Sequence, residues 1–287
     1  MKNIIYFFQF IVIYTLFLIF KIIGYKNSSN LGFLIGKYIG PIIKSKKKIY
    51  KIIDQVEELR NHKNKKKFVE NVLGNYGRIF AEYPHLKNFR NNKLEKYIQI
   101  EGEEYLKKIK DQNKRAVFIS GHFNNFELMA MQIEKAGINL AAIYRPLNNI
   151  FLNKIMEKIR INFICKKQIK KGKSGTRKLI ECLKDGSSVA LMIDQRVTEG
   201  LKINFFGKAA TTTTIPGRLI KKYGCELIPV YIERYNNLFF KIYISKPINI
   251  DQNKTVEEIT IYLNSLLEKM ILNNPDQWIW THDRWKK

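Results

Sequence analysis

The chain has 287 residues, 45% of them hydrophobic, which is enough for one large α/β domain or two small ones and excludes disorder as the default interpretation. Lys and Arg total 51 against 25 Asp and Glu, and the net charge of +26 favours an anionic partner: a nucleic acid, a membrane surface or a phosphorylated substrate. The three cysteines, Cys165, Cys182 and Cys225, lie far apart without any CxxC spacing, so neither a disulfide framework nor a zinc site is indicated and a reducing compartment fits best.

The chain begins with an apolar segment. From Ile4 to Phe20, Gln9 is its one strongly polar residue, and the segment is just long enough to span a bilayer as a helix. A cleaved signal peptide is the alternative, but the following GYKNSSN lacks a small-residue cleavage pattern, which favours a retained anchor. Lysines are more frequent after the segment than before it, so the rest of the chain is expected in the cytoplasm.

We therefore predict three parts. Residues 1–24 form a single-pass membrane anchor, residues 25–48 a basic interfacial segment, and residues 49–287 a cytoplasmic domain. The stretch 31–43 within the second part is short, rich in glycine and broken by Pro41, which suits an interfacial position better than a spanning one.

Helices are expected over residues 49–112, and after that strands and helices alternate. The apolar runs predict strands over 116–120, 138–144, 188–194, 226–234 and 238–245, and the intervening patterns predict helices over 127–136, 148–159, 174–186 and 216–223. Such alternation predicts an α/β fold with a single mixed, largely parallel sheet covered by helices.

Polar residues follow three of these strands. His122 follows the first, Arg145 the second and Asp194 ends the third. Sheets of this kind place their functional sites at the carboxyl ends of strands, so we expect the three residues at one edge.

The stretch FISGHFNNFELMAM can be interpreted in two ways. Asn124 with Glu127 three residues later is typical of a capping box at the start of a helix, and His122 would then be an incidental loop residue. Alternatively, His122 folds back over the first turn, where Glu127 fixes its tautomer and leaves the other ring nitrogen to take a proton from a hydroxyl. The two interpretations do not exclude each other.

The remaining candidates also have structural alternatives. Arg145 could bind a phosphate through two hydrogen bonds or be a surface turn residue, and Arg160 could simply complement a helix C-terminus. Asp194 and Gln195 could cap the next segment or line the site. The tail DQWIWTHDRWKK contains all three tryptophans, which could pack the C-terminal helix on the core or suit a membrane headgroup zone.

Several sites are excluded. There is no G-x-S-x-G nucleophile elbow, and KKGKSGT is not a phosphate loop because Lys167 stands where the first glycine is required. The four histidines are too few and too scattered for a histidine-rich metal site.

Taken in order, SGHFNNFEL, YRPLNN, KIRINF, LMIDQRVTEG, INFFGKAATTTTIPGRLIKKYGCELIPVYIER and PDQWIWTHDRW, with AEY and IEGEEYL before them, resemble one known family. The chain resembles the bacterial lipid A biosynthesis acyltransferases, the lauroyl/myristoyl-transferring branch of the lysophospholipid acyltransferase superfamily. The resemblance covers about Lys67 to Trp285 and the N-terminal anchor, and it implies that the anchor lies in a bacterial inner membrane. One departure is HFNNFE in place of H-x-G-N-W-E, where Asn124 replaces a glycine; asparagine tolerates left-handed backbone angles, so the turn can survive.

The resemblance implies a catalytic pair of His122 and Glu127. His122 would deprotonate a hydroxyl on an acyl chain of a Kdo-bearing, phosphorylated lipid A precursor, and the oxygen would attack the thioester of an acyl carrier protein. The candidate substrate-binding residues are Arg145, Arg160, Asn125, Asp194 and Gln195. The resemblance implies neither metal nor nucleotide, because the thioester is already activated.

Three other functions stay open. An acyltransferase for another membrane lipid, such as a phospholipid or an aminolipid, would use the same chemistry. A membrane-tethered protein that binds nucleic acid is disfavoured, because the basic runs lack interleaved aromatic residues. An inactive relative with a structural role is disfavoured by the intact His122 and Glu127.

Overall fold

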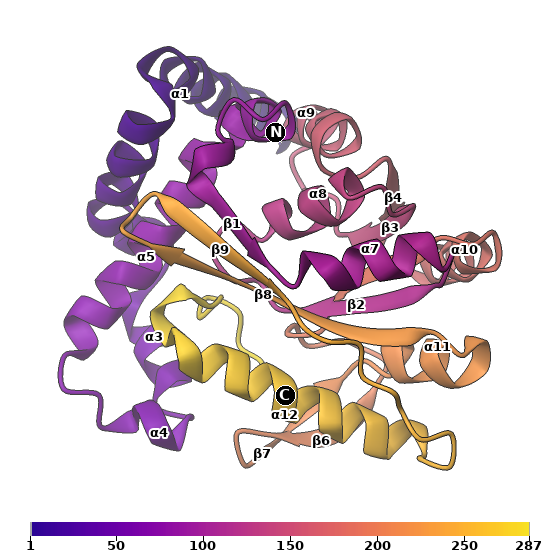
Figure 1. The fold of residues 1–287 in the computed structure, drawn as a ribbon. Helices are drawn as coiled ribbons and strands as arrows, with labels where there is room; N and C mark the ends of the chain where they lie inside the picture. Colours follow the sequence, from indigo (N-terminus) through magenta and orange to yellow (C-terminus); the bar gives the residue numbers. More distant parts are fainter. Residues whose placement is uncertain (1, 287) are drawn as a thin grey trace.

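The apolar runs that predict strands form the centre of the protein. The structure, a computed structural model, describes residues 2–286 and contains a seven-stranded sheet in the order β1-β9-β8-β2-β5-β3-β4, with a separate two-stranded hairpin β6-β7 (Figure 1). Every neighbouring pair in the large sheet is parallel except β8 and β9, so the predicted mixed, largely parallel sheet is confirmed.

The elements have the following bounds. The strands are β1 (Ile98–Glu101), β2 (Ala116–Ser120), β3 (Leu140–Tyr144), β4 (Lys167–Lys170), β5 (Ser188–Met192), β6 (Leu201–Phe205), β7 (Lys208–Thr212), β8 (Glu226–Tyr235) and β9 (Phe239–Ile244). The helices are α1 (Lys2–Tyr38), α2 (Gly40–Ile43), α3 (Lys46–Ile53), α4 (Glu57–Arg60), α5 (Lys65–Glu82), α6 (Leu86–Arg90), α7 (Glu103–Asp111), α8 (Glu127–Lys135), α9 (Ile150–Ile159), α10 (Lys173–Lys184), α11 (Ile215–Tyr223) and α12 (Val256–Asn273). The shorter helical turns are η1 (Tyr83–His85), η2 (Glu95–Tyr97), η4 (Pro275–Gln277) and the π-helical turn η3 (Arg160–Ile164).

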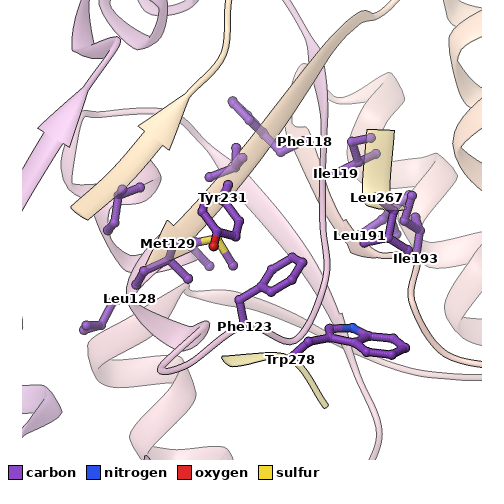
Figure 2. Packing of buried hydrophobic residues seen from close by; sticks show 14 of the residues in the cluster. Phe118, Ile119, Phe123, Leu128, Met129, Leu191, Ile193, Tyr231, Leu267 and Trp278 are labelled. Carbon is purple, nitrogen blue, oxygen red and sulfur yellow. The ribbon is translucent and has the colours of Figure 1, made fainter. Parts of the chain in front are cut away.

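Helices cover both faces of the sheet. Figure 1 shows α12 and the β6-β7 hairpin on one side and α7 and α8 on the other. The central strand β2 is buried along its whole length. Around the end of β2, the buried side chains of Phe123, Tyr231, Leu267 and Trp278 lie close together (Figure 2). The loop after β2 therefore packs on the hydrophobic core.

Four elements differ from the sequence-based expectation. The region 49–112 contains β1 as well as helices, and β4, the β6-β7 hairpin and α12 were not predicted. The strands β1 and β4 have four residues each and lie at the two ends of the sheet. An alternating pattern of four residues is too short to be distinctive. The hairpin turn is made by Phe206 and Gly207, both with positive φ (51° and 70°).

The N-terminal helix α1 is long and apolar enough to cross a membrane. It kinks at Gly24, which has φ 79°, at the predicted boundary between the first two parts of the chain. Next to the kink, the Ser28 hydroxyl donates to the carbonyl of Phe20 at 2.6 Å, and His85 Nε2 lies 3.1 Å from the same oxygen. Burial lowers the pKa of His85, so a neutral ring donates to this carbonyl.

The second half of α1 packs against α5. Their backbones touch at paired glycines, because a Cβ added to Gly77 would lie 1.9 Å from the carbonyl oxygen of Gly32. Ser29, also on this face, donates to the buried carboxylate of Glu82 at 2.7 Å. Residues 25–38 are thus part of the packed body; the interfacial role predicted for residues 25–48, and the three-part division of the chain, stay predictions.

Candidate active site

The carboxyl ends of β2 and β5 bring together the residues of the site. The two strands are parallel neighbours, with Ser120 opposite Met192, so His122 and Asp194 both emerge two residues beyond this register pair. β3 is the parallel neighbour of β5 on its other side, and Arg145 follows its last residue. The expectation that these three residues lie at one edge of the sheet is confirmed.

His122 is held by the carboxylate of Asp194. Its ring Nδ1 lies 2.7 Å from Oδ1 of Asp194, and its backbone N–H donates to Oδ2 at 2.6 Å. The indole Nε1 of Trp278 donates to the same Oδ2 at 2.9 Å. Asp194 is completely buried, whereas the His122 side chain keeps 19% of its exposure. The carboxylate therefore fixes the ring, and Nε2, which has no hydrogen-bond partner among residues 2–286, is left for a substrate.

The two charges favour each other. Burial acts to lower the pKa of His122, but the Asp194 carboxylate and its hydrogen bond outweigh it, and the pKa is raised above its usual value. Glu127 contributes to the same increase at longer range. Burial acts to raise the pKa of Asp194, but His122 and the Trp278 hydrogen bond keep it below its usual value, so the carboxylate stays ionised.

Glu127 is bonded to an arginine and a tyrosine rather than to His122. Nε of Arg160 donates to Oε1 of Glu127 at 2.9 Å, and the Tyr83 hydroxyl donates a short hydrogen bond to the same oxygen. Arg160 Nη2 in turn donates to the Tyr83 hydroxyl at 3.1 Å. The expected hydrogen bond between His122 and Glu127 is thus replaced by one in which Asp194 accepts from the His122 ring, and Glu127 faces the ring only as a nearby negative charge.

Tyr83 stays protonated within this cluster. Burial, together with the adjacent Glu127 carboxylate, holds the pKa of Tyr83 well above its usual range. Its O–H is therefore available as the donor to Glu127, while its oxygen accepts from Arg160. Arg160 begins the π-helical turn η3, and such turns often occur at functional sites.

The predicted capping box at α8 is wrong. The helix begins at Glu127 and has no side-chain cap. Asn124 instead adopts a left-handed conformation with φ 42°, as its substitution for glycine predicts, and its amide donates to Gln277. The Asn125 side chain is completely buried and donates to Glu82 at 3.0 Å, so this bond ties the turn between His122 and α8 to α5.

A buried ion pair holds this turn in place. Glu82 accepts from Arg234 Nη1 at 2.7 Å and Nη2 at 3.0 Å, and both side chains are almost inaccessible, at 0% and 4% exposure. Gln277 joins the same assembly, because its amide forms two hydrogen bonds with the backbone of Arg234 and its carbonyl accepts from the Asn124 N–H. The C-terminal segment thus fixes both Asn124, through Gln277, and Asp194, through Trp278.

The remaining predicted residues lie farther out. Arg145 is exposed, and its guanidinium has no hydrogen bond or ion pair with any residue of the described chain. It lies close enough to Lys171 to help burial lower the pKa of that amine. Gln195 is half-buried beside Asp194, and its side chain has no hydrogen bond within the described range. Arg145 and Lys171, which directly follow β3 and β4, are both exposed and form a basic edge there.

Tyr83, Glu82, Arg234 and Gln277 were not singled out as site residues. Tyr83 and Glu82 belong to the AEY motif, and Gln277 to PDQW, so only the motif resemblance could have indicated them. Hydrophobic periodicity carries no information about them, because they contact the site from distant elements.

Two surface hollows, of about 680 and 630 Å³, lie elsewhere, one beside α7 and Gln132 and the other beside Cys225 and Lys246. Within residues 2–286, no group of three or more His, Cys, Asp or Glu side chains is arranged to hold a metal ion.

Comparisons with known proteins identify the family of the chain. A family model described as bacterial lipid A biosynthesis acyltransferase matches residues 1–287. The chain is 22% identical to the lipid A biosynthesis palmitoleoyltransferase of Escherichia coli (strain K12) over 264 residues, which are 89% of this chain and 84% of that protein. It is 24% identical to the lipid A biosynthesis lauroyltransferase of the same organism over 207 residues, which are 68% and 64% of the two chains.

Proposed function

Since the chain belongs to the bacterial lipid A biosynthesis acyltransferase family, and is therefore an acyltransferase, we propose that it transfers a fatty acyl chain from the thioester of an acyl carrier protein to a hydroxyl of a Kdo-bearing, phosphorylated lipid A precursor. One observation supports the chemistry above all: His122 is held at Nδ1 by Asp194 and presents Nε2 at the carboxyl edge of the sheet. A histidine held in this way is suited to act as a general base.

In the proposed reaction, Nε2 of His122 takes the proton of the acceptor hydroxyl. The oxygen then forms a bond to the thioester carbonyl carbon, and the electron pair of the carbonyl moves to its oxygen. When this intermediate collapses, the carbon–sulfur bond breaks and the thiolate takes the proton from His122. Asp194 stabilises the transient imidazolium because it is ionised and hydrogen-bonded to Nδ1.

The two arginines have different surroundings, and we propose different roles for them. Arg160 already gives Nε and Nη2 to Glu127 and Tyr83, which fixes the orientation of its fork, and its Nη1 has no hydrogen-bond partner in the described part of the chain. A fixed donor of this kind suits the developing oxyanion. Arg145 is exposed and unpaired, which suits a phosphate of the acceptor, and Gln195 would line the same edge.

The proposed donor and acceptor are consistent with the charge of the chain. A net charge of +26 attracts an acidic carrier protein, a phosphorylated lipid and anionic membrane lipids. We propose that α1 anchors the enzyme at the inner membrane with the catalytic domain on the cytoplasmic face, where the lysine-rich flank would lie. The reaction as written uses no metal or nucleotide and no nucleic acid.

The test is acyl transfer from a labelled acyl carrier protein to a Kdo-bearing lipid A precursor in membranes that contain the wild type, His122→Ala or His62→Ala. His62 is exposed in the segment before α5, outside the described site, and provides the matched control. We expect His122→Ala to lose at least about a hundredfold in rate and His62→Ala to retain it.

Other outcomes separate the parts of the proposal. If the wild type labels a different membrane lipid in a His122-dependent manner, the chemistry holds and the acceptor is wrong. If His122→Ala transfers as fast as the wild type, His122 is not the base.

A further inference from the structure

The first half of α1 lies along the body of the protein rather than projecting away from it. One stripe of side chains, spaced three or four residues apart, is less exposed than its neighbours along the whole segment: Tyr6, Phe10, Ile13, Phe17 and Phe20. Such spacing describes one face of a helix that rests on a partner. Figure 1 shows the start of α1 near α9 and its later turns near α5.

The beginning of α1 is bonded to the segment that starts α9. The Asn149 amide donates to the carbonyl of Tyr6 at 2.8 Å and lies 3.3 Å from the side-chain oxygen of Gln9. The ring of Phe151 lies 5.6 Å from that of Phe7 and 6.0 Å from that of Phe10.

The later part of the same apolar segment contacts the body as well. The ring of Phe17 lies 5.1 Å from that of Phe80 on α5, and Phe20 is completely buried against the same ring. His85 reaches the carbonyl of Phe20. Both ends of the apolar segment therefore contact the same domain.

This double attachment bears on how the helix can lie in a membrane. Tyr6 and Phe20 are separated by about 21 Å along a helix. If α1 stood perpendicular to the bilayer, the body would have to follow it to that depth, and α9, with its exposed Lys154 and Lys158, would lie deep in hydrocarbon. A helix that lies in the plane of the membrane avoids this cost.

The surface around α1 and α9 has the composition of a membrane-facing one. α9 contains no buried residue although six of its ten residues are apolar. Large apolar side chains are exposed on both helices and on the residues that flank α9: Ile4, Phe8, Val12, Ile19, Ile22, Leu147, Ile150 and Ile161. α1 has no acidic residue, and the one carboxylate on α9, Glu157, is bonded to Tyr144 and Asn153.

We propose that residues 2–23 of α1 and helix α9 form one surface that lies in the plane of the cytoplasmic leaflet, as a monotopic attachment, in place of the single-pass anchor expected from the sequence. Its occupant is a bilayer with anionic lipids, because the exposed polar groups of α9 are lysines among apolar side chains. The inference rests on the proposed membrane location. Since Arg160 directly follows the last residue of α9, this arrangement places the site at the membrane surface.

The test measures the depth of single cysteine probes in the full-length protein, reconstituted in vesicles with anionic lipids. The background is Cys182→Ser, since Cys165 and Cys225 are buried. Fluorescent probes at Phe8→Cys and Ile19→Cys, on the same face of α1, report its tilt, and a probe at Ile150→Cys reports α9. Ile261→Cys on α12 is the matched control, because Ile261 is 49% exposed and Ile150 is 48% exposed.

We expect nitroxide-labelled lipids to quench the first three probes from the same shallow depth and to leave the Ile261 probe unquenched. Depths at positions 8 and 19 that differ by about 16 Å would show a spanning helix and overturn the proposal. Quenching on α1 without quenching at position 150 would show that α9 does not face the membrane and would overturn the proposal for that helix. Quenching at position 261 equal to that at 150 would also overturn it. If no probe is quenched, the proposed membrane location itself is wrong.

Discussion

The guanidinium of Arg160 is held against the carboxylate of Glu127, with Nε 2.9 Å and Nη2 2.8 Å from Oε1. The two residues are both largely buried, with side-chain exposures of 13% and 8%. Glu127 thus positions a cation beside His122, while the ring itself is oriented by Asp194. Glu127 and Asp194 therefore act on different partners, and substitutions in the two groups should have different effects.

Arg160→Lys should lower kcat by about tenfold or more, because a lysine keeps the charge but cannot reproduce the fixed fork between Glu127 and Tyr83. Tyr83→Phe should lower kcat less, since it removes one hydrogen bond and leaves the ion pair. Steady-state acyl-transfer rates with a thermal-unfolding check would measure both. Tyr105→Phe is the control, because its hydroxyl has no hydrogen bond within residues 2–286. A wild-type rate for Arg160→Lys would contradict a role for the fork.

The rate should depend on pH through His122. The base must be unprotonated, and the pKa of His122 is raised above its usual value of about 6.5, so activity should fall as pH decreases through a midpoint above that value. Asp194→Asn removes the charge that raises this pKa, so the variant should be at least about a hundredfold slower and its midpoint should move to lower pH. Asp185→Asn, on the exposed end of α10, should change neither. An unchanged midpoint in Asp194→Asn would argue against the pairing.

The stability of the fold should also depend on pH through His122 and Asp194, with opposite signs for the two residues. Because folding raises the pKa of His122, its contribution to stability is present below the unfolded value and is lost as pH rises through the folded one. The contribution of Asp194, whose pKa folding lowers, is present above its unfolded value and is lost as pH falls. Asp194→Asn should therefore flatten the pH dependence of the unfolding midpoint.

Glu82→Gln should destabilise the fold by about 3–5 kcal/mol, because it leaves Arg234 buried without its counter-charge. The loss should also reduce activity, since Asn125 and the turn after His122 rest on Glu82. Denaturant unfolding of the detergent-solubilised protein gives the free energy. Glu226→Gln, which breaks a more exposed pair with Lys114, should cost about 0–1 kcal/mol. Equal costs for the two variants would contradict the argument.

Gly77→Ala should loosen the packing of α1 on α5. The added Cβ would lie 1.9 Å from the Gly32 carbonyl oxygen, so the backbones must separate, at a cost of about 1–3 kcal/mol. Gly217→Ala on α11 is the control, because its Cβ would meet neighbours at 3.4 Å, an ordinary contact. Thermal unfolding of both variants measures the difference, and a Gly77→Ala protein as stable as the control would show that the helices can separate freely.

The sequence by itself determined the class of fold and the edge of the sheet that holds the site. The apolar run Ala116–Ser120 forms a buried strand, and α8 begins at Glu127, both as predicted. Both predictions depend on local patterns of apolar residues. Once strands and helices alternate, the parallel sheet and its carboxyl edge follow from general rules of chain connection, so the placement of His122, Arg145 and Asp194 was predictable.

The tertiary structure alone decided which carboxylate holds His122. Glu127 is five residues away in sequence, but Arg160 and Tyr83 bind it from elements remote from α8. Asp194 is 72 residues away and reaches the ring because β5 pairs with β2. Sequence periodicity records which residues are buried in each element but not which elements become neighbours. Contacts between distant segments form only when the whole sheet assembles, and the choice between two nearby carboxylates is made there.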